Sequence, residues 1–136
     1  MEAEAPLTGS VIRVTEGLMG FETVKSYQLL GSEEEAPLRW LQMKAEPRLS
    51  FLVIEPALAL SSYQPDIAEE DLAAIGLSTP EDALVLNIVT IHGDGKATVN
   101  LKGPILINRQ TLAARQTVPL NAAKLSVEHP LPLAKT

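Results

Sequence analysis

Short apolar runs, separated by proline and glycine, fill most of the chain and predict a small fold built mainly of β-strands. The ten prolines and eight glycines are spread from end to end, and such punctuation cuts a chain into strand-sized pieces. The segments expected to form strands are Ser10–Val14, Lys25–Leu30, Leu38–Lys44, Ser50–Glu55, Leu84–Ile91, Ala97–Lys102, Ile105–Ile107 and Arg115–Val118.

The strongest of these strands is Leu84–Ile91, because its alternate positions are apolar on both faces. A strand of this kind is covered on both sides. It is followed by His92–Lys96, in which Asp94-Gly95 supplies the positive-φ residue that a hairpin loop needs. The return segment alternates apolar and polar residues, so the two segments are expected to pair as antiparallel strands.

One clear helix signal interrupts the strands. Asp66, followed by Glu69 three residues later, has the pattern of a capping box, and Gly76 fits the position just after a helix end. A helix of about two turns is therefore expected over Ile67–Ile75. Thr79-Pro80 repeats the start signal and is expected to begin a single turn.

Seven or eight short strands with one or two short helices predict a compact antiparallel β-barrel-like domain. The 136 residues suit one domain with its own core. We therefore expect a single domain spanning residues 1–136, with residues 1–8 and 130–136 mobile at its ends.

Charge is divided unevenly along the chain. Residues 49–95 contain eight acids and no Lys or Arg, whereas residues 96–136 contain six bases and one acid. The cation-free segment is expected to carry a negative potential that attracts basic partners and repels phosphates, which disfavours direct binding of nucleic acid. The alternative is an acidic, solvated face that serves only solubility.

The sequence contains no constellation of catalytic or metal-binding residues. There is no cysteine, and the two histidines, His92 in the hairpin loop and His129 near the C-terminus, have no ligand spacing. Nucleophile-elbow, P-loop and dinucleotide-binding patterns are absent. We therefore predict a protein that is not an enzyme and that holds no cofactor and no metal. Neither a secretory signal nor a run of about 20 apolar residues occurs, so no membrane association is expected.

Three segments together resemble the FliW family of flagellar assembly factors. They are Glu16-Gly17-Leu18-Met19-Gly20-Phe21-Glu22, then Leu38-Arg39-Trp40-Leu41-Gln42 with the residues that follow it to Tyr63, and then Ile88-Val89-Thr90-Ile91 with Thr98–Asn108 and Gln116. Their order and spacing match that family from Gly9 to Leu131. Gly103 departs from the family pattern, in which alanine is common at this position, and Ser126-Val127-Glu128-His129 is reduced from the family's Tyr-x-x-Arg-His.

The resemblance implies a FliW-like β-domain in a cytoplasmic protein that binds two partners. One is flagellin before its secretion, and the other is CsrA, a translational repressor that binds mRNA. The resemblance further implies that the factor released when flagellin is exported binds CsrA and relieves the repression of flagellin synthesis. We expect such a protein to be monomeric when alone.

Two kinds of residue are candidates for partner contact: acids of the helical region, by charge, and two aromatic residues of the types that often anchor interfaces. The set is Glu69, Glu70, Asp71, Glu81, Asp82, Trp40 and Tyr63. For the family motifs the alternative is a structural role, in which Gly17 and Gly20 allow tight turns and Asn100 and Asn108 bond to backbone groups.

Two other functions stay open on the sequence. A small ligand-binding or enzymatic β-barrel would require a deep pocket with convergent polar groups. An oligonucleotide-binding barrel would require a basic groove with exposed aromatic residues, and the cation-free segment argues against it.

Overall fold

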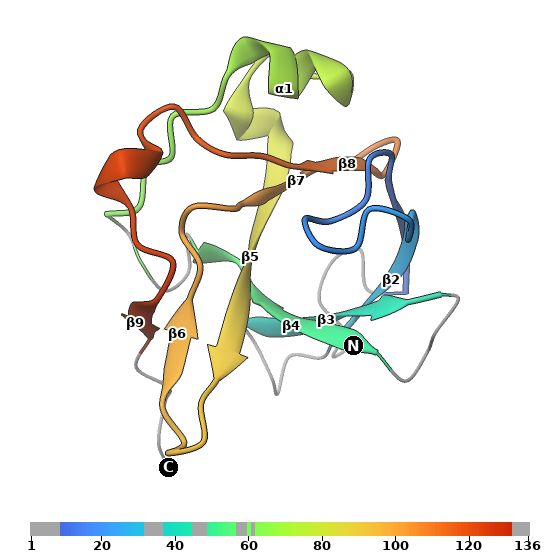
Figure 1. The fold of residues 1–136 in the computed structure, drawn as a ribbon. Helices are drawn as coiled ribbons and strands as arrows, with labels where there is room; N and C mark the ends of the chain where they lie inside the picture. The colour runs from blue at the N-terminus through green and yellow to red at the C-terminus, as the bar shows by residue number, and fades with distance from the viewer. Residues whose placement is uncertain (1–8, 32–36, 45–48, 57–59, 61, 132–136) are drawn as a thin grey trace, which may run out of the picture.

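The computed structural model describes residues 9–31, 37–44, 49–56, 60 and 62–131. Its strands are β1 Val11–Val14, β2 Ser26–Leu30, β3 Leu38–Met43, β4 Ser50–Ile54, β5 Ala83–Ile91, β6 Ala97–Val99, β7 Ile105–Asn108, β8 Ala113–Gln116 and β9 His129–Leu131. Its helical elements are α1 Glu69–Ala74 and the single turns η3 Pro80–Asp82 and η4 Ala122–Lys124 (Figure 1). The predicted mobility of residues 1–8 and 132–136 lies outside the described residues.

Each of the eight strands expected from the sequence is present, with ends that differ by a few residues. The ninth strand, β9, lies where the sequence predicts a mobile tail. Leu131 is buried and pairs with Ala97 of β6, and Pro130 pairs with Thr98. Residues 130 and 131 thus belong to a strand, and Pro130 is tolerated there because β9 is the outermost strand of the sheet, where a missing N–H breaks no ladder.

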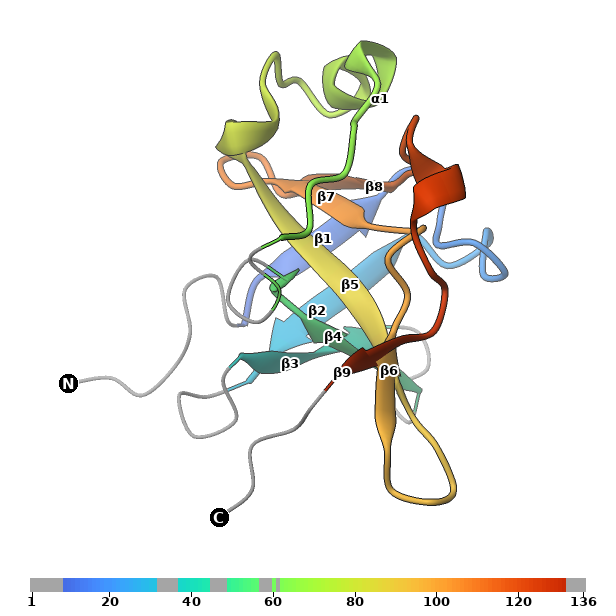
Figure 2. The same ribbon diagram turned by 90° about the vertical axis from the view of Figure 1, so that its left-hand side faces the viewer.

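The strands form one sheet that closes on itself. Neighbouring strands follow the order β4-β3-β2-β1-β8-β7-β5, and β5 also pairs with β4, which completes a ring of seven strands. β6 and β9 extend the sheet from β5 (Figure 2). The expected mainly β, barrel-like domain is confirmed as a ring-like sheet. The pair β1–β8 is parallel, so the expectation of a wholly antiparallel sheet is corrected at this point.

β5 connects the parts of the sheet because it is long enough to have different partners along its length. Its first half pairs with β7. Further along, Val89 pairs with Leu52 of β4 and also with Val99 of β6, so these two strands lie on opposite edges of β5. Leu84 and Leu86 belong to one apolar cluster and Val89 to another, which confirms that β5 is covered on both faces as far as Val89, whereas Ile91 at its end is 49% exposed.

Three apolar clusters stabilise the domain, each through removal of side chains from water. The largest gathers inward-facing residues of the ring, among them Ile12, Tyr27, Leu41 and Ile105. The buried hydroxyl of Tyr27 has no hydrogen-bond partner among the described residues, and burial raises the pKa of this side chain. The second cluster lies between the β4–β5 region and the β6–β9 extension, and the third packs α1 against the sheet.

The helix α1 begins two residues later than predicted, and the capping box is wrong. Its N-cap is Ala68, which makes no side-chain cap hydrogen bond. The N–H of Asp66 instead donates to Asn121 Oδ1 at 2.8 Å, so Asp66 is held against the C-terminal segment. The end of the helix is as predicted: Gly76 has φ +80°, and the N–H groups of Gly76 and Leu77 donate to Ala73 and Leu72, the pattern of a Schellman motif. The predicted turn at Pro80 is confirmed as η3.

Candidate protein-interaction site

The first family motif, residues 16–22, is a loop whose shape depends on a glycine. Gly17 has φ +73°, and a Cβ built on it would lie 2.5 Å from the Cα of Glu22. Only a residue without a side chain fits so close to another backbone segment. Gly20 also has a positive φ, +89°, but nothing lies within 4 Å of its Cβ position. The expected turn role of both glycines is confirmed, and Gly17 has the additional role of allowing the close approach.

The other motif residues hold this loop in place. Leu18 is buried in the main cluster, and the ring of Phe21 packs edge-on against Phe51 with centroids 5.1 Å apart. The N–H of Met19 donates to Gln116 Oε1 at 2.7 Å. The N–H of Gly20 donates to Glu22 Oε2 at 3.0 Å, and this bond lowers the pKa of Glu22 below its ordinary value. These contacts give the motif residues a role in holding the loop, while Met19 and Phe21 stay 49% and 40% exposed.

Arg115 on β8 connects the motif loop to α1. Its Nε donates to Asp71 Oδ1 at 2.8 Å, and its Nη1 lies 3.1 Å from Glu16 Oε1. The hydroxyl of Thr117 donates to the second oxygen of Asp71. The hydrogen bond that Arg115 donates to Asp71 is the largest cause of the raised pKa of Arg115.

Asp71 therefore differs in its surroundings from the other acids predicted to contact a partner. Its side chain is buried and both of its oxygens are bonded within the protein. The expectation that Asp71 forms part of an exposed acidic face is wrong, because α1 turns this side chain toward β8, where Arg115 neutralises it. Glu69 and Glu70 of α1 are exposed, as are Glu81 and Asp82 of η3.

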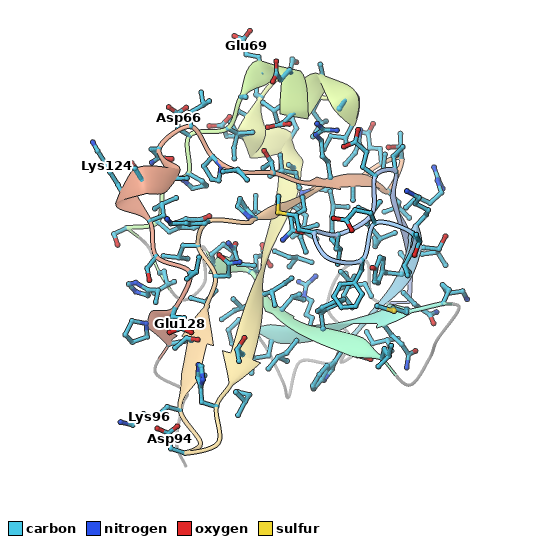
Figure 3. The ribbon with its side chains drawn as sticks, in the orientation of Figure 1. Asp66, Glu69, Asp94, Lys96, Lys124 and Glu128 are labelled. Carbon is cyan, nitrogen blue, oxygen red and sulfur yellow. The ribbon has the colours of Figure 1, made fainter. Side chains whose placement is uncertain are left out.

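The acids of the cation-free segment do not form one continuous face. Glu55 lies 3.2 Å from the Arg39 guanidinium. Asp94 is at the tip of the β5–β6 hairpin, at the opposite end of the molecule from Glu69 (Figure 3). The exposed acids of this segment are thus divided between the end that carries α1 and η3 and the hairpin tip, and the expectation of a single acidic side is corrected to that extent.

The two aromatic candidates differ in their surroundings. Trp40 is 39% exposed on β3, with Leu30 and Leu52 as its register partners on the neighbouring strands, so its ring is accessible to a partner. The hydroxyl of Tyr63 donates to the Leu101 carbonyl at 2.8 Å and accepts a bond from Asn87 Nδ2 at 3.2 Å.

Tyr63 therefore attaches the segment before α1 to the sheet. Its ring packs against the second cluster, and burial raises its pKa. The structure thus gives Tyr63 a structural role, whereas the exposed part of the Trp40 side chain is open to a partner.

The two asparagines of the third motif bond to backbone groups, as expected. Asn100 Oδ1 accepts from the N–H of Lys102 at 2.9 Å. Asn108 donates to the Ile75 carbonyl at 2.8 Å and accepts from the N–H groups of Gln110 and Thr111. Asn108 thus joins the end of α1 to the β7–β8 turn.

A surface hollow of about 310 Å³ lies next to this turn and is lined by Leu77, Glu81, Asp82, Asn108, Arg109 and Gln110. It brings together two of the predicted acids, but Arg109 lines it as well. Among the described residues no group of three or more His, Cys, Asp or Glu side chains could hold a metal ion. His92 is half-buried, with Nε2 2.8 Å from Thr98 Oγ1.

Two residues of interest were not singled out from the sequence. Arg115 holds the motif loop through Glu16, and Leu120 is the most exposed large apolar side chain of the described residues, at 69%. Gln116 belongs to the third family segment, and its bond to Met19 gives it a role in holding the motif loop. The alternation around β8 identifies Arg115 and Gln116 only as positions on a strand. Their bonds join segments about a hundred residues apart, which no local pattern reports.

No helix in the described part of the chain is long and apolar enough to span a bilayer.

The fold defines a class of small ring-like β-domains that carry one short helix. A solved structure described as the flagellar assembly factor FliW shares this fold with a TM-score of 0.81 and 28% identity, covering 93% of this chain and 88% of that one. The family model described as FliW protein matches residues 5–131. The chain belongs to the FliW family.

Individual relatives agree with this assignment. The flagellar assembly factor FliW of Leptospira interrogans is 41% identical over 113 residues, which cover 82% of this chain and 75% of that protein. The protein of the same name from Natranaerobius thermophilus is 37% identical over 123 residues, which cover 89% and 81%. That from Treponema denticola is 39% identical over 120 residues, which cover 88% and 80%.

Proposed function

We propose that this protein is a flagellar assembly factor of the cytoplasm that binds flagellin and, when free of flagellin, binds and antagonises the translational repressor CsrA. In this scheme the protein is monomeric when alone and acts as a binding protein rather than as an enzyme. Export of flagellin releases it, and its capture of CsrA then permits renewed flagellin synthesis.

The observation that carries this proposal is the match to the FliW family over residues 5–131. The surface is compatible with it. Exposed carboxylates at Glu69, Glu70, Glu81 and Asp82 can steer the approach of a basic, RNA-binding protein. Exposed apolar side chains such as Trp40 can supply contact energy once the two proteins meet.

The alternative functions find less support in the described residues. The interior of the ring is filled by the largest apolar cluster, and the hollow beside η3 lies at the surface, so neither offers a small ligand a deep apolar site. The bases of the C-terminal third are dispersed: Arg115 is paired with Asp71, and Lys96 and Lys124 lie far apart (Figure 3). A basic groove for an oligonucleotide would require them to be together.

The test uses purified protein with flagellin and CsrA from the same organism. Isothermal titration measures each binary affinity, and a gel-shift assay follows CsrA on the leader of flagellin mRNA. The protein is expected to release CsrA from this RNA, and added flagellin is expected to restore the CsrA–RNA complex. Lack of binding to both proteins would refute the proposal, whereas binding to flagellin alone would refute its CsrA half.

A further inference from the structure

Two exposed apolar side chains stand beside the acidic end of the molecule. Val118 is 55% exposed and Leu120 is 69% exposed, while Pro119 between them is buried. A single exposed leucine is ordinary in a soluble protein. Val118 and Leu120, on either side of the buried Pro119, together form a local apolar protrusion.

The backbone around this protrusion is held at both ends. The N–H of Leu120 donates to the Asp66 carbonyl at 2.7 Å, and the N–H of Thr117 donates to the Pro104 carbonyl at 3.0 Å. The Asn121 side chain adds bonds to the N–H of Asp66 and to the carbonyl of Gln64. These contacts fix the segment alongside the approach to α1, as the two neighbouring chain segments in Figure 1 show. A protrusion that is already ordered loses little conformational entropy on binding.

The charges on the α1 side of the protrusion are mainly negative. Asp66 lies next to Leu120 through the backbone hydrogen bond, and Glu69 and Glu70 follow on α1, all three exposed. Lys124 on η4 supplies a positive charge in the same region (Figure 3). These carboxylates give the α1 side of the protrusion an acidic border, which complements an apolar patch with Lys and Arg beside it.

We propose that Val118 and Leu120 are the apolar centre of a docking surface for a basic, RNA-binding protein, with Asp66, Glu69 and Glu70 as its acidic border. This inference rests on the proposed function, in which such a protein is the second partner, and it assigns that partner to a place on the molecule. The apolar pair supplies most of the contact energy, and the acids set the rate of association and its dependence on salt.

The test measures the Kd for CsrA of the full chain and of two variants. Val118→Ser/Leu120→Ser is expected to weaken binding by about tenfold or more, as loss of a central apolar contact does. Glu69→Gln/Glu70→Gln is expected to slow association and to reduce the dependence of Kd on salt concentration. The matched control is Ile91→Ser/Val127→Ser, which removes side chains of 49% and 53% exposure from other parts of the surface and is expected to bind as the unchanged protein does. Circular dichroism and thermal unfolding establish that each variant is folded.

Each alternative result has a separate meaning. If the unchanged protein binds CsrA and the folded Val118/Leu120 variant binds it equally well, the docking surface is refuted and the proposed function stands. Loss of flagellin binding in that variant, with CsrA binding intact, refutes the assignment to the RNA-binding partner. Light scattering that shows self-association lost in the same variant would make the surface an interface between copies of this chain. Failure of the unchanged protein to bind CsrA refutes the proposed function itself.

Discussion

Replacement of Gly17 by alanine is expected to destabilise the protein far more than the same replacement of Gly20. Both glycines have positive φ, +73° and +89°, so alanine at either site is strained by about 1 kcal/mol. At Gly17 the new Cβ would in addition lie 2.5 to 2.7 Å from three backbone atoms of Glu22. Backbone cannot rotate away as a side chain can, so the loop must shift.

The magnitude follows from these two contributions. Overpacking against a well-ordered neighbour costs about 1–3 kcal/mol, which brings the expected loss for Gly17→Ala to about 3 kcal/mol. Gly20→Ala meets nothing within 4 Å, and the reduced freedom of the unfolded chain returns part of its strain. A loss of about 1 kcal/mol or less is therefore expected for Gly20→Ala.

Urea unfolding followed by circular dichroism measures both free energies of unfolding. A shift of the Gly17→Ala midpoint to lower urea, at unchanged slope, is the expected result. Equal losses for the two variants would show that the positive φ alone matters and that the contact with Glu22 does not. Such a result would refute the reasoning from close approach.

Three further predictions concern single side chains. Tyr63→Phe removes the hydroxyl that bonds Leu101 and Asn87 and is expected to lower the free energy of unfolding by about 1–2 kcal/mol. Tyr27→Phe removes a buried hydroxyl without a partner among the described residues and is expected to leave this free energy unchanged or to raise it. Equal losses for the two variants in chemical denaturation would contradict this reasoning. Arg115→Met leaves the Asp71 carboxylate buried without its cation and is expected to lower the free energy of unfolding by about 2 kcal/mol, which is less than for a fully buried pair because Arg115 is partly exposed. Lys124→Met is the exposed control, and a similar drop in melting temperature for both variants would show that the Asp71 pair is not stabilising. Because the pKa of Glu22 is lowered in the folded protein, the stabilisation by its carboxylate is present above about pH 4.5 and is lost as the pH falls through the folded-state pKa. The difference in unfolding free energy between Glu22→Ala and the unchanged protein should therefore shrink from pH 7 to pH 3. A constant difference would show that the bond from the Gly20 N–H to the Glu22 carboxylate does not stabilise the protein.

Much of the local structure could be predicted because its causes lie within a few residues. Alternation of apolar and polar positions identified the strands, and Gly76 identified the end of α1, since only the residues of that helix end take part in the Schellman motif. The predicted start of α1 is wrong because its cause lies far away along the chain. The N–H of Asp66 bonds Asn121, 55 residues away, and this tertiary contact replaces the local capping box.

The candidate site was predicted less completely than the fold. Glu69, Glu70, Glu81 and Asp82 are exposed as their charge suggests. Asp71 has the same local sequence signal, yet it is buried against Arg115. The difference arises from which face of α1 meets β8, and a stretch of three successive acids does not contain that information.

The sequence by itself determined eight strands, the β5–β6 hairpin, the helix end and the lack of a recognisable catalytic pattern, because each depends on neighbours along the chain. Tertiary structure alone decided that β4 and β5 close the ring, that β1 and β8 run parallel, and that Val118 and Leu120 stand exposed beside the acids of α1. These features join segments separated by tens of residues. Their free energy comes from burial and pairing between surfaces that exist only after the chain has folded.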